Sequence, residues 1–367
     1  MSTTSFRSFS ASLRLCGFLL ICVAPRPPAG AAAIIPKGYV CVRVPAPPAI
    51  DGVMNERIWQ QAAWTDDFVD IEGSAKPHPR FRTRVKMVWD DSCLYIGAEL
   101  TEPHVWATLT RRDTVIFYNN DFEVFIDPDG DNLEYYEFEM NALNTAWDLF
   151  LAKPYRDGGP PRDGWDITGL RTGVHVRGTL NNPSDADTGW TVEIAMPWRA
   201  LGEYAHRTAP PAIGDTWRIN FSRVEWHHEI ADGSYRRVAG TKEDNWVWSP
   251  QGIIDMHQPE MWGYCQFAGP HGRPSDFKPD LSRHAKDILC RIYHAEKEFA
   301  RRNGYWASNL DQLGLMPIPL SGLADPPALS LTRTGFLATA TALLPHRKKL
   351  TWFIREDSRL WNDESHN

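Results

Sequence analysis

A hairpin pattern at residues 121–141 restricts the fold of this chain more than any other feature of its sequence. Side chains alternate in character at residues 122–126 and again at 135–141, and the residues between them read Asp-Pro-Asp-Gly-Asp. A period of two is typical of β-strands, and a short polar run with Pro and Gly is typical of the turn that joins them. We therefore predict two antiparallel strands connected by the turn at 127–131.

The same alternation assigns the side chains of this hairpin to two faces. The first face is apolar and is expected to face the core: Phe122, Val124, Ile126, Tyr136, Phe138 and Met140. The second face is mostly polar and carries Asp121, Glu123, Phe125, Tyr135, Glu137, Glu139 and Asn141. Functional side chains are therefore expected on the second face.

Further short strands are expected at residues 84–89, 93–100, 172–180, 190–194, 216–224, 246–248 and 261–267. The first two of these are expected to pair antiparallel, and residues 55–63 favour a short helix. Many short strands separated by turn signals predict a mainly β fold. We predict an antiparallel β-sandwich of the jelly-roll or immunoglobulin-like type over residues 34–268.

The pattern changes after this predicted sandwich. Residues 269–282 are rich in Pro and Gly and are predicted to be a linker. Apolar residues then recur at helical spacing between 285 and 299, and short apolar strands are expected at 336–344 and 350–354. We predict a separate small α+β module over residues 283–367, of unknown role.

The first 33 residues have the composition of a cleavable signal peptide. Arg7 and Arg14 precede an apolar run at 15–24, and small residues follow it. The apolar run is shorter than the ~20 residues that span a bilayer. We therefore expect a secreted or periplasmic protein without a membrane span, and the bulky Ile21 before Cys22 argues against a lipoprotein anchor.

Net charge and aromatic content narrow the class of partner. A formal net charge of -7 with interspersed basic and acidic residues gives no cationic surface for nucleic acid or anionic lipid. The chain has 16 Trp, 11 Tyr and 16 Phe, which is more flat apolar surface than one sandwich core needs. Some of these rings are therefore expected to contact a neutral ligand.

The cysteines do not predict a metal site. Four of them follow the predicted signal peptide: Cys41, Cys93, Cys265 and Cys290. They allow three full disulfide pairings, between which the sequence does not choose, and they also suit buried positions as small apolar residues. No pair has CxxC spacing, and no two histidines have the spacing of zinc ligands.

Calcium is the one cofactor that the sequence leaves open. Asp127, Asp129 and Asp131 resemble the start of a calcium-binding loop, because alternating carboxylates can surround a hard cation. The EF-hand pattern then fails, since Gly130 comes too early and Phe138 occupies the last ligand position. A polar hairpin turn is the favoured interpretation.

The polar face of the hairpin is compatible with three functions. Carboxylate and amide groups such as those of Glu123 and Asn141 can bind sugar hydroxyls. Two carboxylates at a suitable separation are also the catalytic groups of a glycoside hydrolase. A structural or docking domain, whose aromatic rings all lie in the core or in an interface, is the third hypothesis, and the carboxylates could also form a plain solvated strand face. Carbohydrate binding is the leading hypothesis.

Tryptophan rings are the second feature that favours sugar binding, because they stack on pyranose rings. Trp246 and Trp248 share one face if their segment is a strand, where they either pack in the core or contact a ligand. Trp147 and Trp165 are expected in surface connections. Trp165 is expected to be exposed, since residues 157–164 offer it little core.

Five short motifs together resemble carbohydrate-binding module family 9 and its DOMON-like relatives. They are Ile50-Asp51-Gly52 with Trp59, Leu94-Tyr95-Ile96-Gly97, residues 121–127, residues 189–194 and residues 259–263. The resemblance covers about residues 40–268. It implies a β-sandwich that binds glucose- or xylose-type sugars or polysaccharide ends between two Trp rings, with calcium bound elsewhere. It also implies association with other glycan-degrading proteins in carbohydrate catabolism.

The resemblance assigns roles to particular residues. Glu123 and Asn141 match the family's sugar-bonding carboxylate and amide. Phe117 or Tyr118 stands where the family has its first stacking Trp, and Glu139 stands where the family has a sugar-bonding Arg. No residue near Met256 firmly matches the second Trp. The expected ligand-binding set is Glu123, Asn141, Phe117, Tyr118, Glu139, Trp165, Trp246 and Trp248, with no catalytic residue and no recognisable hydrolase domain.

Overall fold

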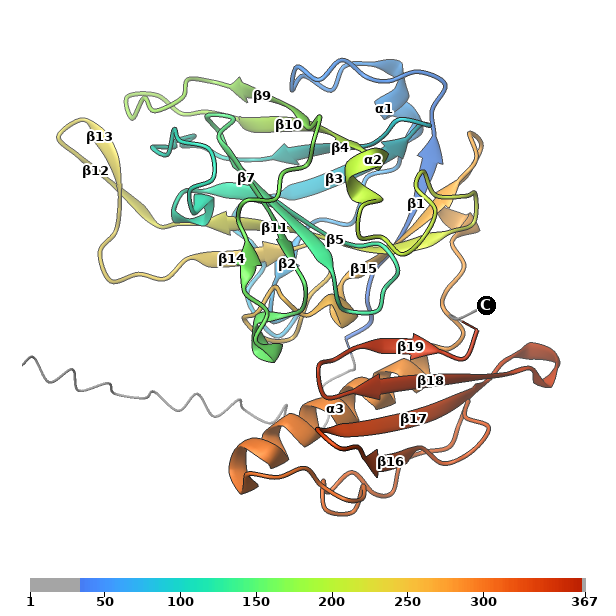
Figure 1. The fold of residues 1–367 in the computed structure, drawn as a ribbon. Coiled ribbons are helices and arrows are strands. Elements are labelled where there is room, and N and C mark those ends of the chain that lie inside the picture. The colour runs from blue at the N-terminus through green and yellow to red at the C-terminus, as the bar shows by residue number, and fades with distance from the viewer. Residues whose placement is uncertain (1–33, 365–367) are drawn as a thin grey trace, which may run out of the picture. The chain divides into compact units, whose positions relative to one another are not determined.

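Strands form most of the regular secondary structure (Figure 1) of this computed structural model, which describes residues 34–364. The predicted signal peptide, with Cys16 and Cys22, lies outside the described residues. The main sheet contains β1 (Gly38–Arg43), β2 (Val69–Asp70), β3 (Thr83–Trp89), β4 (Cys93–Leu100), β5 (Asp121–Asp127), β6 (Tyr135–Asn141), β7 (Ala146–Leu151), β8 (Pro161–Arg162), β9 (Arg171–Arg177), β10 (Gly189–Pro197), β11 (Thr216–Glu225), β14 (Asp244–Val247) and β15 (Gly263–Ala268).

Short helices and one separate hairpin complete this part of the chain. The helices are α1 (Arg57–Gln61), α2 (Trp198–Leu201) and the 3-10 turns η1 (Ile116–Tyr118), η2 (Tyr155–Asp157), η3 (Pro259–Met261) and η4 (Pro274–Asp276). The hairpin consists of β12 (His228–Ala231) and β13 (Ser234–Arg237).

The main sheet follows the strand order β8-β7-β6-β5-β11-β15-β1-β3-β4-β10-β9. β1 runs parallel to β15 and β3, whereas the other paired strands of the sheet run antiparallel. Residues of β3, β4 and β10 share one apolar core with residues of β5, β6 and β11. The two halves of the sheet therefore pack against each other as a sandwich, which confirms the predicted fold class.

The core face of the β5–β6 hairpin follows the predicted alternation. Phe122 pairs with Met140, and Val124 pairs with Phe138, in an antiparallel register. These side chains are all buried in the main core, as are Ile126 and Tyr136. The antiparallel pairing of β3 with β4 is also as predicted.

The opposite face of β5, β6 and β7 is buried as well, although by loops rather than by a second sheet. Ile116 in η1 and Trp262 in the loop before β15 belong to one apolar cluster with Phe125, Tyr135 and Leu149 of the sheet. The carboxylates of this face therefore lie in an enclosed layer and not on an open solvated surface.

The C-terminal elements form a helix packed on a small sheet (Figure 1). They are α3 (Arg283–Asn303), β16 (Ala328–Leu331), β17 (Phe336–Leu343), the 3-10 turn η5 (Pro345–Arg347), β18 (Lys349–Arg355) and β19 (Leu360–Asn362). The apolar side of α3, including Leu289 and Ile292, packs on Phe336 and Ile354 of the sheet. A helix was predicted here, and α3 begins and ends within a few residues of it.

The described residues 34–364 belong to one compact unit. Hydrogen bonds join the last strands to the β5–β6 turn, including Arg359 Nε to Asp131 at 3.1 Å and Asn132 Nδ2 to the carbonyl oxygen of Ser358 at 3.0 Å. The division into a sandwich, a linker and a separate module stays a prediction.

Two further properties concern the described residues. None of their helices is both long enough and apolar enough to cross a membrane. Cys41, Cys93, Cys265 and Cys290 all carry free thiols, and the first three are buried.

Candidate functional site

Four carboxylates lie together on the outer face of β5 and β6. The ladder pairs Glu123 with Glu139 and Asp121 with Asn141, so these side chains point to the same face, and Glu137 lies further along β6. One oxygen from each of Asp121, Glu123 and Glu139 lies within 4.8 Å of the other two. Glu123 and Glu137 are each 5% exposed, and the other two acids are 1% exposed.

Few hydrogen bonds hold these carboxylates. Asp121 Oδ1 accepts from the backbone N of Val224 at 3.1 Å, and Glu139 Oε2 accepts from the backbone N of Phe117 at 3.0 Å. The second oxygen of Asp121 is buried and has no hydrogen-bond partner among the described residues. The Glu139 bond ties η1 to the sheet, and so it positions Phe117 beside the acids.

Burial changes the titration of the whole group. It raises the pKa of Glu123 to about 7 and holds the pKa values of Asp121, Glu137 and Glu139 well above the usual range of a carboxyl. Repulsion between the neighbouring acids acts in the same direction. Within residues 34–364, no Lys or Arg forms an ion pair with any of these four acids.

His257 is the basic residue nearest to this group, and it does not neutralise it. Its Nε2 lies 3.8 Å from Glu137, and its Nδ1 lies 2.9 Å from the hydroxyl of Tyr135. Burial, together with the charge of Arg156, lowers the pKa of His257 to about 3. The imidazole is therefore neutral near pH 7 and supplies no positive charge to the four acids. Protonation of the acids, or a bound cation, would reduce their mutual repulsion.

Asn141 shares this face, but protein groups already occupy its side-chain amide. The Nδ2 group donates to the carbonyl oxygen of Leu109 at 2.8 Å, and Oδ1 accepts from the backbone N of Leu143 and of Thr145. The side chain is fully buried. In this conformation the side-chain amide of Asn141 shapes the β6–β7 turn.

Phe117 and Tyr118 lie at the edge of the same face. Phe117 is half-buried, whereas the Tyr118 ring is 51% exposed and lies 4.9 Å from the Phe117 ring. The guanidinium of Arg237 lies 5.6 Å from the Tyr118 ring and 4.4 Å from that of Trp226. Tyr118 thus supplies exposed aromatic surface on this side of the sheet.

The three Trp residues of the expected set lie elsewhere. Trp246 and Trp248 are buried in the sandwich core, where Trp248 packs edge to face on Tyr39. Trp165 is half-buried rather than exposed, because its ring stacks on Tyr136 with centroids 4.8 Å apart, and Tyr136 faces the core. These rings do not converge on Glu123 in this structure.

Trp147 does lie on the acidic face, and its position corrects the expected surface connection. It belongs to β7, directly opposite Glu139 on the neighbouring strand, and it is 9% exposed. Its indole Nε1 is buried and has no hydrogen-bond partner in the described part of the chain. The alternation of Trp147, Leu149 and Leu151 is the sequence signal that identifies this strand.

The turn between β5 and β6 offers a second group of acids. Asp127 accepts from the backbone N of Gly130 and of Asn132, and oxygens of Asp127, Asp129 and Asp131 lie within 4.8 Å of one another. Burial raises the pKa of all three carboxyls, that of Asp131 to about 6. Clustered carboxylate oxygens fit a hard cation such as calcium, so these three residues would hold it.

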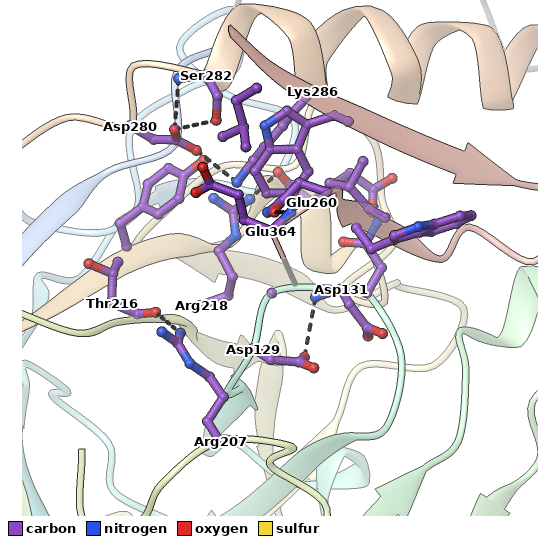
Figure 2. A pocket seen from close by; sticks show the side chains of 18 of the residues that line it. Asp129, Asp131, Arg207, Thr216, Arg218, Glu260, Asp280, Ser282, Lys286 and Glu364 are labelled. Carbon is purple, nitrogen blue, oxygen red and sulfur yellow. Dashed lines mark hydrogen bonds and ion pairs between the residues drawn. The ribbon is translucent and has the colours of Figure 1, made fainter. Parts of the chain in front are cut away.

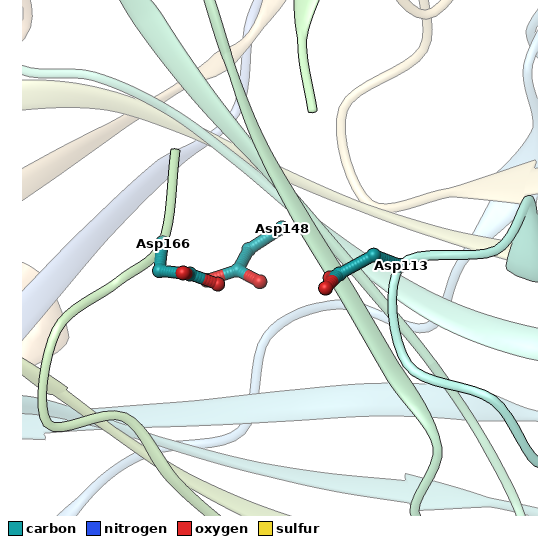
Figure 3. Close-up of side chains that lie close together, drawn as sticks. All are labelled: Asp113, Asp148 and Asp166. Atoms are coloured by element: carbon teal, nitrogen blue, oxygen red, sulfur yellow. The ribbon is translucent and has the colours of Figure 1, made fainter. Parts of the chain in front are cut away.

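A third group of acids already contains a cation. Asp113, Asp148 and Asp166 point toward one another (Figure 3), and their oxygens also lie within 4.8 Å. The guanidinium of Arg112 contacts all three, at 3.5 Å from Asp113 and 2.8 Å from Asp166. A metal ion would have to displace this guanidinium, so the group is better explained as an ion-pair network.

A cavity of about 1000 Å³ lies beside the turn (Figure 2) and is separate from the acidic face. None of the eight expected ligand-binding residues lines it. Two of its cations are paired, Lys286 with Asp280 at 2.8 Å and Arg359 with Asp131 at 3.1 Å. Arg207 donates to the carbonyl oxygen of Thr216.

A β-sandwich that encloses acidic and aromatic side chains on one sheet face, beneath covering loops, has the form of a ligand-binding module. Residues 50–246, more than half of the chain, match the family described as carbohydrate family 9 binding domain-like. The chain belongs to this family, which confirms the resemblance seen in its motifs. No curated protein matches the chain.

Several solved structures are similar in fold. A family 9 carbohydrate-binding module from Caldicellulosiruptor kristjanssonii in complex with cellotriose is 19% identical, covers 66% of this chain and 99% of its own, and has a TM-score of 0.41. A complex of such a module from the same organism with glucose is 18% identical, covers 66% and 100%, and has a TM-score of 0.40. A candidate carbohydrate-binding protein from Bacteroides uniformis is 15% identical, covers 64% and 100%, and has a TM-score of 0.47.

Proposed function

We propose that this protein binds glucose- or xylose-type sugars, or the ends of their polysaccharides, on the outer face of β5 and β6. The observation that carries the proposal is the placement of Glu123 beside Glu139, next to Phe117 and Tyr118, in a member of a family of carbohydrate-binding domains. Carboxylate oxygens accept hydrogen bonds from sugar hydroxyls, and an aromatic ring packs on the C–H face of a pyranose.

The aromatic part of this site is one-sided. Tyr118 is the exposed ring, Phe117 supports it, and the half-buried Met256 packs in the same cluster as Phe117. We therefore propose stacking on Tyr118 alone rather than a clamp between two Trp rings. Trp165, Trp246 and Trp248 are left out of the proposed site, because core residues cover their rings.

The biological setting is part of the proposal. The predicted signal peptide supports export to the periplasm or the outside of the cell, where polysaccharide is available. The family assignment supports a role in carbohydrate catabolism beside other glycan-degrading proteins.

Titration of the purified protein with a panel of mono- and oligosaccharides tests the proposal, with calorimetry as the readout. Glu123→Gln and Tyr118→Ala are each expected to weaken binding by about tenfold or more, which is the loss of about 1.4 kcal/mol. Glu229→Gln, the same change at an exposed carboxylate of β12, is the matched control and should leave affinity unchanged. Absence of binding across the whole panel would overturn the proposal.

A glycoside hydrolase is the second candidate, and one observation favours it. A pKa of about 7 for Glu123 is suitable for a general acid. The mechanism also needs an ionised partner carboxylate, and burial raises the pKa of every neighbouring acid as well. The same glycan panel separates the two functions, since release of reducing sugar that Glu123→Gln abolishes would establish the hydrolase.

A further inference from the structure

The acids of the outer face lack the cationic partners that several other buried acids of this sandwich have. Glu102 and Glu225 are buried against Arg223, at 2.7 Å and 2.8 Å. Glu260 is paired with Arg156 at 2.9 Å. Asp121, Glu123 and Glu139 have no such partner among residues 34–364, and they lack the three N–H donors that surround the buried Glu193, although a buried carboxylate is stable in its charged form only beside a cation or several hydrogen-bond donors.

A second observation comes from a side chain that is not acidic. Trp147 stands directly opposite Glu139, is nine-tenths buried, and has an indole N–H without an acceptor in the described chain. A buried donor without a partner costs free energy, so an acceptor on a bound molecule would stabilise it. The face therefore presents three carboxylates without a cationic partner, one of them with an unpaired oxygen on Asp121, beside one unpaired donor.

These two requirements discriminate between classes of ligand. A metal cation would balance the carboxylates but cannot accept a hydrogen bond from Trp147. A neutral sugar offers hydroxyl acceptors and donors but leaves the charge of the acids unbalanced. A sugar that carries an ammonium group meets both requirements, because the ammonium donates three charge-assisted hydrogen bonds and the hydroxyls accept.

We propose that the preferred ligand of this face is an amino sugar of the glucosamine type, whose ammonium group binds Asp121, Glu123 and Glu139. The inference rests on the proposed function and specifies its ligand. The geometry agrees with it, because three oxygens that lie within 4.8 Å of one another can all lie about 2.8 Å from one nitrogen, the length of a charge-assisted N–H···O bond. A hydroxyl of the same sugar accepts from Trp147.

Three matched ligands test the inference, namely glucosamine, glucose and N-acetylglucosamine, each also as a short β-1,4-linked oligomer. Glucose lacks the nitrogen, and N-acetylglucosamine keeps it without its charge. Calorimetry near pH 7, where much of the amine is protonated and the ammonium favours the ionised form of the acids beside it, is expected to show binding of the glucosamine ligands about tenfold or more tighter than binding of either neutral series.

Variants of the acids connect this preference to the face. Glu139→Gln and Asp121→Asn are expected to reduce the ratio of the glucosamine affinity to the glucose affinity severalfold, because each removes one charged acceptor of the ammonium group. Glu229→Gln, at an exposed carboxylate, controls for general attraction of a cation to an acidic protein. Thermal melts confirm that each variant is folded, and the comparison of the three ligands on the unaltered protein does not depend on the variants.

The outcomes separate this inference from the proposed function. If the neutral sugars bind as tightly as glucosamine, or bind tightly only after calcium is added, the inference is wrong and carbohydrate binding stands. If no sugar of any series binds, both are wrong. If the preference for glucosamine survives in Glu139→Gln and Asp121→Asn, the acidic face is not its cause, and the inference is overturned.

Discussion

The carboxylate of Glu193 accepts a hydrogen bond from the indole N–H of Trp59 at 2.7 Å. Its other oxygen accepts from the backbone N of Asp51 at 3.1 Å and of Gly52 at 2.7 Å. Glu193 lies in β10 and is fully buried. Two of the sequence motifs that resemble the family, separated by more than a hundred residues, therefore meet at one carboxylate, which attaches the N-terminal loop to β10.

Glu193→Gln is expected to destabilise the protein. The amide group of Gln accepts at one end and donates at the other, so at least one of the three N–H groups around this carboxylate would lose its acceptor. We expect a loss of about 2 to 4 kcal/mol in the free energy of unfolding, measured by urea denaturation. Glu229→Gln at an exposed site should stay within about 0.5 kcal/mol of the unaltered protein. Equal stability of the two variants would contradict the structural role of Glu193.

Gly52→Ala tests the same junction from the backbone side. Gly52 has a φ of +88°, and a Cβ atom there would lie 2.5 Å from the backbone carbon of Val174. Gly240 has a similar φ of +79° but no atom within 4 Å of its Cβ position, so Gly240→Ala is the matched control for strain alone. We expect Gly52→Ala to cost at least about 1 kcal/mol more than Gly240→Ala in the free energy of unfolding. Similar costs would mean that the loop can move away from β9.

The sandwich was predictable because local patterns specify it. Alternation assigns Phe122, Val124 and Met140 to the core face of the hairpin without knowledge of any other strand, and these side chains do lie in the core. β7 was not predicted, because Trp147 was assigned to a long surface connection rather than to a strand. β1 was missed because its pairing is parallel, with partners at β15 and β3 that are distant in the sequence.

The candidate site was less predictable, because burial by distant loops decides it. A strand Trp has the same local pattern whether it packs inward or outward, and Trp248 packs inward on Tyr39. Alternation places Asn141 on the polar face, but it cannot show that the loop containing Leu109 accepts the hydrogen bond of its amide. The enclosure of Glu123 also depends on loops that no strand pattern describes.

Glu123→Gln should make stability less dependent on pH. An ordinary Glu releases its proton near pH ~4.3, whereas burial raises the pKa of Glu123 to about 7 in the folded state. Between these values the folded protein binds more protons than the unfolded chain, so the contribution of Glu123 to the free energy of unfolding falls as pH rises. The loss is complete above the folded pKa and amounts to roughly 4 kcal/mol.

The measurement is the difference in unfolding free energy between Glu123→Gln and the unaltered protein at several pH values. The variant should gain stability relative to the unaltered protein from about pH 4 upward and reach its full advantage by about pH 8. Titrating groups that do not interact with Glu123 cancel in this difference, including His257, whose lowered pKa gives the opposite slope. Loss of the Glu123 charge also reduces its repulsion with Asp121, Glu137 and Glu139, which favours the variant in the same direction as pH rises. A difference that is independent of pH would show that Glu123 titrates as an exposed carboxyl.

Calcium is expected to stabilise the protein through the β5–β6 turn. Oxygens of Asp127, Asp129 and Asp131 lie within 4.8 Å of one another, and burial raises the pKa of each carboxyl, so a cation there would relieve their mutual repulsion. A ligand that binds only the folded state at about 100 times its dissociation constant adds about 2.7 kcal/mol. We therefore expect millimolar calcium to raise the Tm near pH 8, where Asp131 is ionised, and a chelator to reverse the rise.

Asp129→Asn identifies the site of this effect. Asn can still accept the hydrogen bond from the backbone N of Asp131, so the turn is kept, but one carboxylate is lost. The rise in Tm with calcium should shrink or disappear in this variant. It should persist in Asp113→Asn, where Arg112 already balances the acids. If the rise in Tm is lost in Asp113→Asn and kept in Asp129→Asn, calcium does not bind at the turn. If calcium does not raise the Tm of the unaltered protein, the prediction of a calcium site is wrong.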